Sequence, residues 1–270
     1  MKEQHGVVRR YRERPAPPAL ASRVACAWTQ QVPEDGYLQR IMPDGCLDLI
    51  WRDGVLEMVG PDTGPRVLPL AAGSVAGVRL RPGAAGLLLG DVPAAALRDL
   101  QVPLSELWGS RAQQVADRLS AADGADEAAR LLEELAVARL PEHHQDPAVA
   151  EAIRLLSGPR APGVPEIAQH LGWSARHFRR RFTAAVGYSP KTLHSILRFR
   201  RSIELEGPLA DRALAAGYAD QAHLSREVRR LSGLTAAELL TGRTPEACAR
   251  HRSSPADGTP APSPVPTAAT

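Results

Sequence analysis

Arginine side chains gather on one predicted helix in the C-terminal half of this 270-residue chain. Residues 174–186 begin with a serine, a favoured helix N-cap, and Phe178, Phe182 and Val186 then follow at the spacing of one helical face. Elsewhere on the circumference stand Arg176, Arg179, Arg180 and Arg181. Because a guanidinium binds phosphate and can bond both O6 and N7 of guanine, this pattern indicates nucleic-acid contact. The alternative is a helical hairpin whose basic face is only solvated.

A short helix and a tight turn come just before this arginine-rich helix. Pro165 suits a first helical turn, and Ile167, Ala168 and Leu171 fall on one face. Gly172 supplies the left-handed residue that ends a helix. A short helix, a turn and a second helix make a helix-turn-helix, whose second helix can enter a DNA major groove.

The same pattern returns later in the chain. Gly172-Trp173 matches Gly217-Tyr218, and residues 187–190 match residues 233–236. Between the units, residues 189–206 predict a linker helix that starts at a Ser-Pro pair and stops at a Gly-Pro pair. Chance rarely repeats so many positions, so the sequence predicts two helix-turn-helix units joined by a helix.

Together these motifs resemble the DNA-binding domain of the AraC/XylS-type transcription regulators. The matching motifs are Ile167-Ala168, Gly172-Trp173-Ser174, Phe178-Arg-Arg-Arg-Phe182, Gly187-Tyr-Ser-Pro190, Gly217-Tyr218 and Gln221-Ala-His-Leu-Ser-Arg226. The resemblance covers roughly residues 146–240. It implies a monomeric domain that places two recognition helices in successive major grooves on one face of the duplex.

The resemblance also implies which residues contact DNA. The base contacts it implies are Arg176, Arg179, Arg180, Gln221, His223, Ser225 and Arg226. The phosphate contacts it implies are Arg181, Lys191, Arg229 and Arg230. The chemistry agrees, because arginine pairs with guanine and glutamine with adenine, whereas phosphate contacts set register without reading sequence. For each arginine the alternative is a merely solvated surface position.

The second unit departs from the pattern at three positions. Arg212 stands where the first unit has Ile167, Val228 replaces a phenylalanine, and Ala236 replaces a proline. An arginine on a core-facing position must reach solvent or find a partner, because burying it alone is costly. We therefore expect the second unit to be less stable than the first and to supply less of the specificity.

Charge is divided between the two parts of the chain. The net charge is only +3, but residues 160–252 carry 16 basic and 8 acidic side chains, against 17 and 21 in residues 1–159. An excess of positive charge on the helix-turn-helix part is what nucleic-acid binding requires.

Residues 24–89 predict a β-rich N-terminal domain. Six short apolar runs alternate with Gly, Pro and Asp turn signals, which is typical of a small sandwich or barrel. In view of the resemblance to the AraC/XylS-type regulators, this β-rich segment resembles their cupin-like N-terminal sensor barrel. Residues 42–50, 60–61 and 77–83 are similar to an uncharacterised N-terminal domain of such regulators. The fold class predicted is therefore α+β, with a β-rich barrel-like domain, a helical connector and an all-α C-terminal domain.

Candidate ligand-pocket residues lie in this β-rich part. They are Trp28, Trp51, Met58, Arg79 and Arg81, which offer apolar walls with polar anchors. The alternative is that the aromatic rings fill the core. Because Val78 and Leu80 alternate with the two arginines, the arginines would then face solvent.

The sequence lacks the residues that the two candidate enzyme classes need. No histidine occurs between His5 and His143, so the metal-binding constellation of a catalytic cupin is missing. Cys26, Cys46 and Cys248 do not have the spacing of the zinc-held reactive cysteine of methyl-accepting repair regulators. The sequence thus predicts no enzyme, no catalytic residue, no metal site and no cofactor.

Four segments are expected. They are a sensor-like domain at 1–109, a helical connector at 110–145, the AraC-type domain at 146–242 and a disordered tail at 243–270. The leucines of the connector form either a dimer interface or an intramolecular core. An odd cysteine count and the lack of a long apolar run predict a cytoplasmic protein without membrane contact.

The function predicted is a sequence-specific DNA-binding transcription regulator. Its expected partners are double-stranded promoter or operator DNA, a small-molecule effector, a second copy of the chain and, for an activator, RNA polymerase. One rival is a protein-interaction module whose degenerate second unit no longer reads DNA. The other rival is a DNA-repair or barrel enzyme.

Overall fold

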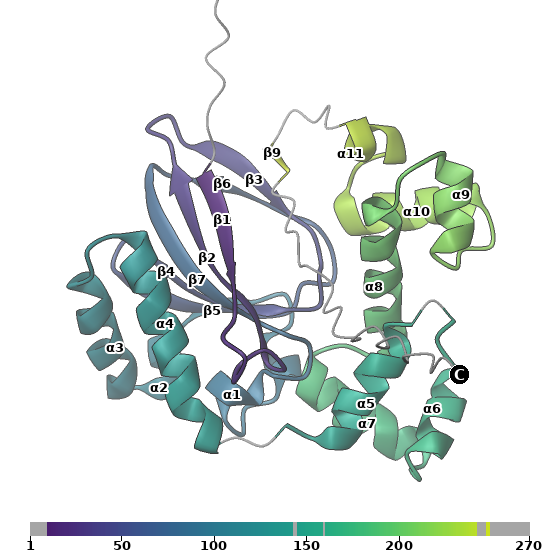
Figure 1. Cartoon of the computed structure of the whole chain (residues 1–270), viewed down its shortest axis with the longest axis horizontal. Coiled ribbons are helices and arrows are strands. Elements are labelled where there is room, and N and C mark those ends of the chain that lie inside the picture. Colours follow the sequence, from purple (N-terminus) through teal and green to yellow (C-terminus); the bar gives the residue numbers. More distant parts are fainter. Residues whose placement is uncertain (1–9, 143–144, 159, 242–246, 249–270) are drawn as a thin grey trace, which may run out of the picture.

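The computed structural model describes residues 10–142, 145–158, 160–241 and 247–248. Figure 1 shows a β-rich N-terminal part, helices along one side of it, and a wholly helical C-terminal part beside it. The α+β class predicted from the sequence is confirmed. No helix among the described residues is long and apolar enough to cross a membrane.

The strands form two sheets. The larger contains, in spatial order, β1 (Arg10–Pro15), β2 (Val24–Val32), β7 (Gly73–Leu80), β4 (Leu47–Arg52), β5 (Val55–Val59) and β8 (Gln101–Pro103), all antiparallel to their neighbours. The smaller contains β6 (Arg66–Leu70), β3 (Tyr37–Ile41) and β9 (Ala247–Cys248). The N-terminal part is thus a β-rich domain, as the sequence predicts. β9 belongs to the segment predicted as a disordered tail, and the rest of that segment lies outside the described residues.

Side-chain alternation gives the large sheet two different faces. Leu49 of β4 and Val78 of β7 are fully buried in the core on the helix side. Their neighbours Asp48 and Arg79 point the other way, toward the smaller sheet. Between the sheets, Trp28 of β2 packs in a second apolar cluster with residues of the smaller sheet.

Helices cover the outer face of the large sheet. The helical elements after β7 are α1 (Gly86–Leu89), the 3-10 turn η1 (Ala94–Leu97), α2 (Leu104–Trp108), α3 (Ser110–Ser120), α4 (Ala125–Arg139) and the 3-10 turn η2 (Leu140–Glu142). Of these, α2 and α3 lie against β5, whereas η1 packs against the C-terminal part. α4 lies against β2 and β7, and buries Ala128, Leu132 and Ala136 in the sheet's core. Leu131 and Leu135 pack on the same core. The connector leucines therefore form an intramolecular core.

The C-terminal helices begin where the sequence places caps. They are α5 (Pro147–Leu156), α6 (Val164–His170), α7 (Ala175–Val186), α8 (Pro190–Glu204), α9 (Leu209–Ala215), α10 (Gln221–Ser232) and α11 (Ala236–Thr241). Asp146, Ser174 and Ser189 each accept a hydrogen bond from a backbone amide of the helix that follows. Phe178, Phe182 and the residues of the second unit share one apolar core that includes α8.

Removing a buried leucine of α4 tests whether this helix serves the core of one chain. We expect Leu132→Ala to lower the free energy of unfolding by about 2–5 kcal/mol, because it leaves a cavity. Val137 on the same helix is 43% exposed, so Val137→Ala is the control and should change it by less than about 0.5 kcal/mol. Urea-induced unfolding at several protein concentrations measures both. A cost for Leu132→Ala that grows on dilution would place the residue between copies instead.

Candidate nucleic-acid interface

The turns that lead into α7 and α10 have the same hydrogen bonds. In the first unit the amide of Trp173 donates to the carbonyl of Ala168 at 2.8 Å. In the second unit the amide of Tyr218 donates to the carbonyl of Ala213, also at 2.8 Å. The repeat found in the sequence is therefore a repeat in three dimensions.

Each turn then passes through a left-handed glycine and an N-cap. Gly172 has a φ of 67° and Gly217 a φ of 83°. A residue with a side chain would be strained at these values, whereas glycine is not. Ser174 and Asp220 cap α7 and α10 by accepting from the amide three residues on. The two units thus begin their recognition helices in the same way.

A histidine braces each recognition helix against its turn. The rings of Trp173 and His177 meet edge to face at 4.9 Å, and those of Tyr218 and His223 do so at 5.1 Å. These are favourable aromatic arrangements. His223, which the resemblance implies as a base contact, is half-buried in this brace.

The polar face of α7 is open to solvent. Phe178, Phe182 and Val186 are fully buried, whereas Arg176, Arg179 and Arg180 are exposed. Arg176 and Arg179 form no ion pair with any residue that the structure describes. No acidic side chain among the described residues therefore competes with DNA for the guanidinium groups of Arg176 and Arg179.

Arg181 differs from these three arginines. Its Nη2 lies 2.6 Å from Oδ2 of Asp146, which also caps α5, and its guanidinium stands over the Trp173 ring at 5.3 Å. This side chain is thus held in place by the domain itself, as suits a contact with a fixed phosphate.

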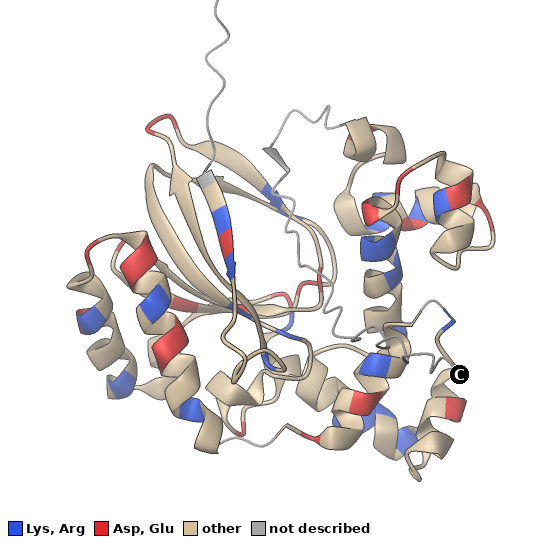
Figure 2. Ribbon diagram, viewed as in Figure 1, with Lys and Arg blue, Asp and Glu red and all other residues tan. Residues whose placement is uncertain are grey.

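In the second unit Gln221, Arg226 and Arg229 are exposed. Ser225 is half-buried, and its hydroxyl donates to the carbonyl of Gln221 at 2.8 Å. Lys191, at the start of α8, is exposed as well. Figure 2 shows Lys and Arg residues on α8 and α10 in this part of the molecule.

Arg230 is tied to its own helix and to α8. Its Nη2 lies 2.9 Å from Oε2 of Glu227, and also donates to the Ser195 hydroxyl at 2.9 Å. The hydrogen bonds from Arg230 lower the pKa of Glu227 to about 2. Arg230 therefore braces α10 on the linker helix.

Arg212 avoids the burial that its position implies. Ile167, its counterpart, is fully buried, whereas Arg212 is half-buried and its Nε donates to the carbonyl of Gly207 at 2.8 Å. The arginine thus finds a partner at the surface, which leaves the core of α9 to Ala213.

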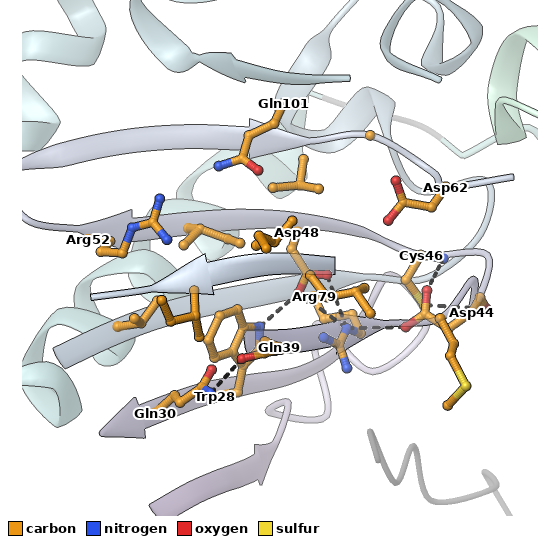
Figure 3. Close-up of a pocket in the computed structure, with 18 of the residues that line it drawn as sticks. Trp28, Gln30, Gln39, Asp44, Cys46, Asp48, Arg52, Asp62, Arg79 and Gln101 are labelled. Carbon is orange, nitrogen blue, oxygen red and sulfur yellow. Dashed lines mark hydrogen bonds and ion pairs between the residues drawn. The ribbon is translucent and has the colours of Figure 1, made fainter. Parts of the chain in front are cut away.

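A pocket lies between the two sheets of the N-terminal part, with an empty volume of about 770 Å³ that includes open solvent (Figure 3). Of the five candidate residues, Trp28 and Arg79 line it. Trp51 and Met58 instead pack on the helix side of the sheet, because alternation puts them on the face of Leu49. Arg81 lies past the end of β7, where its Nε donates to the carbonyl of Ala21.

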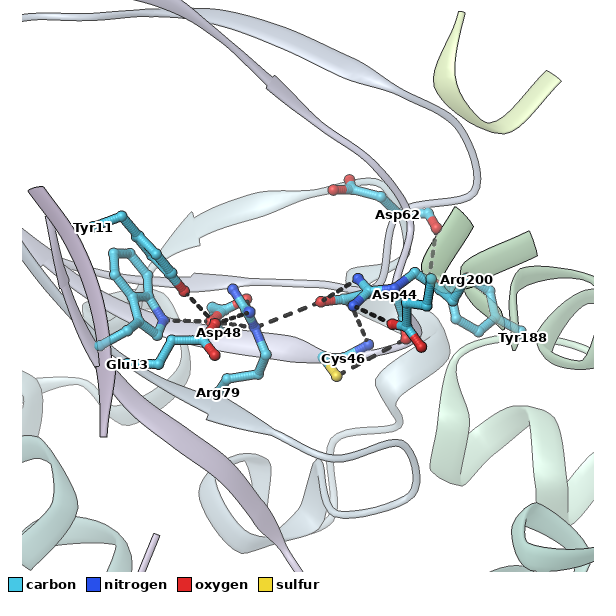
Figure 4. Close-up of polar contacts among 11 residues, drawn as sticks. Tyr11, Glu13, Asp44, Cys46, Asp48, Asp62, Arg79, Tyr188 and Arg200 are labelled. Atoms are coloured by element: carbon cyan, nitrogen blue, oxygen red, sulfur yellow. Dashed lines mark hydrogen bonds and ion pairs between the residues drawn. The ribbon is translucent and has the colours of Figure 1, made fainter. Parts of the chain in front are cut away.

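Arg79 is only 2% exposed, so it does not face solvent as the alternative required. Its Nε lies 3.2 Å from Asp48 and 3.5 Å from Asp44, and its Nη1 lies 3.4 Å from Glu13 (Figure 4). Asp48 also accepts from Nε1 of Trp28 at 2.7 Å, and burial raises the pKa of this carboxyl. Paired charges of this kind are the form in which a buried guanidinium is tolerated.

Sequence reasoning missed the acidic partners of Arg79. A signal exists in hindsight, because Asp48 and Arg79 each interrupt an apolar strand, and such charges on neighbouring strands tend to pair. Asp44 and Asp62, which also line the pocket, lie in loops and carry no such signal. Among the described residues, no group of three or more His, Cys, Asp or Glu is placed to hold a metal ion.

Family comparisons divide the chain as the fold does. Residues 167–242 match a family model described as a helix-turn-helix domain. The C-terminal part is an AraC-type DNA-binding domain. Residues 12–103 match a domain of unknown function, DUF6597. A comparison with the curated proteins found no match.

Solved structures offer a looser likeness. An AraC-type transcriptional regulator from Chromobacterium violaceum is 24% identical over 37% of this chain and 94% of its own, with a TM-score of 0.34. An apo variant of ToxT from Vibrio cholerae is 14% identical over 86% and 100%, with a TM-score of 0.44. ToxT bound to an unsaturated fatty acid is 14% identical over 79% and 93%, with a TM-score of 0.40.

The AraC-type domain touches the pocket wall. The hydroxyl of Tyr188, a residue 1% exposed, donates to the carbonyl of Asp62 at 2.6 Å. Arg200 of α8 lies 4.0 Å from the carboxylate of Asp44 (Figure 4). Met42 packs in the apolar core of the AraC-type domain. The pocket and the contact between the domains therefore share residues.

The side-chain carboxyl of Asp62 should make the stability of the fold depend on pH. Burial raises the pKa of its carboxyl to about 6, although Arg66 lies 3.3 Å away. A raised pKa means that the folded chain holds the proton more tightly, so the contribution is complete below pH 4 and is lost as pH rises through 6. The free energy of unfolding relative to Asp62→Asn should fall by about 2 kcal/mol between pH 4 and pH 7. Urea unfolding of both proteins across this range measures it, and a constant difference would contradict the assignment.

Proposed function

We propose that this protein is a sequence-specific transcription regulator that reads two adjacent major-groove segments with α7 and α10. The observation that carries the proposal is the repeated turn, cap and aromatic brace before two helices whose polar faces are exposed. A helix held by its turn and open on its polar face is the geometry with which such units enter the groove.

Base reading is assigned by exposure and chemistry. The first unit would read bases with Arg176, Arg179 and Arg180. The second would read them with the exposed Gln221 and Arg226 and with the half-buried His223 and Ser225. Phosphate contacts fall to Arg181, Lys191, Arg229 and Arg230. Arg181 and Arg230 are compatible with this division, because about half of each side chain is exposed although its guanidinium is ion-paired within the chain.

The first unit should supply more of the specificity than the second. Three of the four exposed arginines on α7 are assigned to bases, and each can bond guanine at two atoms, whereas α10 offers one glutamine and one arginine for such paired bonds. A mutational scan of operator bases measures the division. Equal losses over both half-sites would contradict it.

The N-terminal domain is proposed to sense a small molecule in the pocket between its sheets. Apolar walls, among them Ile41 and Ile50, and polar groups around Arg79 offer both parts of a binding site. A second copy of the chain and, for activation, RNA polymerase are the further partners of this proposal. A regulator of this kind would act in the cytoplasm, where its operator DNA lies.

Selection of bound sequences from a random DNA pool, with the full chain, tests the function. We expect a two-part motif whose halves lie about one helical turn apart, because the two helices would enter successive grooves. A single short motif would leave the second unit with phosphate contacts only. No enrichment, or binding that is insensitive to salt, would overturn the function and favour a protein-interaction module.

Two substitutions separate base reading from phosphate contact. Arg180→Ala should cost about 1–3 kcal/mol and relax the preference at one base pair. Lys191→Ala should weaken binding to all sequences alike and reduce the salt dependence by about one counterion. Arg111, exposed on α3 of the N-terminal part, gives the charge-matched control Arg111→Ala, which should change neither. Binding titrations at several salt concentrations measure all three, and a uniform loss for Arg180→Ala would make it a phosphate contact.

A further inference from the structure

Both recognition helices end against the N-terminal domain. The C-cap of α7 is Gly187 and that of α10 is Gly233, with φ of 87° and 73°, and the two glycines are equivalent positions of the repeat. The last carbonyls of a helix have no partner within the helix and carry the negative end of its dipole. A cationic donor from another part of the chain is therefore well placed there.

At the first of these helix ends the donor is Arg98. Its Nε donates to the carbonyl of Gly187 at 2.6 Å. The packing is close, since a Cβ on Gly187 would stand 2.4 Å from Cγ of Pro61 and 3.3 Å from the carbonyl oxygen of Ala94. The next residue, Tyr188, donates to Asp62 as described above.

At the second helix end the donor is Arg40 of β3. Its Nη1 donates to the carbonyl of Ser232, the last residue of α10, at 3.0 Å. A Cβ on Gly233 would stand 3.0 Å from the same Nη1 and 3.5 Å from Cγ of Pro65. Two arginines of the N-terminal domain thus donate to backbone carbonyls at the corresponding ends of α7 and α10, one to the C-cap glycine and one to the residue before it.

A third contact lies between them, on the linker helix. Arg200 of α8 faces Asp44, and a Cβ on Gly45 would stand 2.8 Å from Cδ1 of Leu193. The N-terminal domain therefore touches the end of α7, α8 and the end of α10. It leaves the reading faces free, because Arg180 and Arg226 are exposed in this arrangement.

We propose that the N-terminal domain sets the placement of α7 relative to α10, with Arg98 and Arg40 as positioning residues, and so selects the spacing between the two half-sites. The inference rests on the proposed function. The proposal predicts an effect that a change in DNA affinity alone would not produce. The contacts made by Arg98 and Arg40 would determine the preferred distance between the half-sites and leave the base preferences within each half-site unchanged.

The test uses the full chain and DNA that carries the selected half-sites at a series of spacings. The wild-type chain should prefer one spacing. In the double variant Arg98→Ala, Arg40→Ala that preference should fall by about tenfold or more, since two hydrogen bonds from charged groups are lost, while the preferred bases within each half-site stay the same. A second double variant, Arg98→Lys with Arg40→Ala, keeps a cationic donor at position 98. It should show part of the spacing preference that the Arg98→Ala, Arg40→Ala variant loses. Arg111→Ala is the charge-matched control.

A pair of glycine substitutions gives a second, independent readout. Gly187→Ala and Gly172→Ala both place a side chain at positive φ, 87° and 67°. Only at Gly187 does the new Cβ meet the N-terminal domain, because nothing lies within 4 Å of one at Gly172. Gly187→Ala should therefore broaden the spacing preference and Gly172→Ala should not.

The outcomes that overturn the inference are distinct from failure of the function. An unchanged spacing preference in the double variant, or an equal loss of binding at every spacing, would remove the positioning role while leaving DNA reading intact. A wild-type chain that binds its half-sites without any spacing preference would do the same. A wild-type chain that enriches no DNA would overturn the proposed function and the inference with it.

Discussion

An α-helix cannot satisfy its own last carbonyls, and in this protein that constraint joins the two domains. The recognition helices α7 and α10 both end in left-handed glycines, and an arginine of the N-terminal domain donates to each end. A left-handed glycine turns the chain without a side chain, so Pro61 and Pro65 can approach the backbone closely. The same corner that terminates a helix is thus the surface on which the other domain rests.

The buried charged residues of the N-terminal domain extend to the contact between the two domains. Arg79 lies between the sheets among Glu13, Asp44 and Asp48, and Asp44 also faces Arg200 of α8. Breaking a buried ion pair is costly, because the remaining charge loses its partner in a medium that solvates it poorly. A ligand that binds the Arg79 cluster would therefore compete with a group that also contacts the AraC-type domain. Pocket and interface are linked through one carboxylate.

The predictions from sequence succeeded where the cause is local. Ser174 caps α7 by acting on an amide three residues away, and the Ser-Pro pair at 189–190 starts α8, so both roles follow from spacing alone. Arg212 was expected to need a partner because of its place in the repeat, and it has one. The pocket was predicted less well. Trp51 and Met58 were grouped with Trp28, although the structure puts them on the opposite face of the sheet.

By itself, then, the sequence determined the two helix-turn-helix units, the cap Ser174 of α7 and the arginine-bearing faces, because helical periodicity and capping depend on near neighbours. Only the tertiary structure decided which face of the large sheet meets the smaller sheet, that α4 completes the core of its own chain, and that Arg98 and Arg40 meet the ends of α7 and α10. These contacts join residues 89 and 192 positions apart. No local pattern encodes such pairings, since they arise from the packing of whole elements against one another.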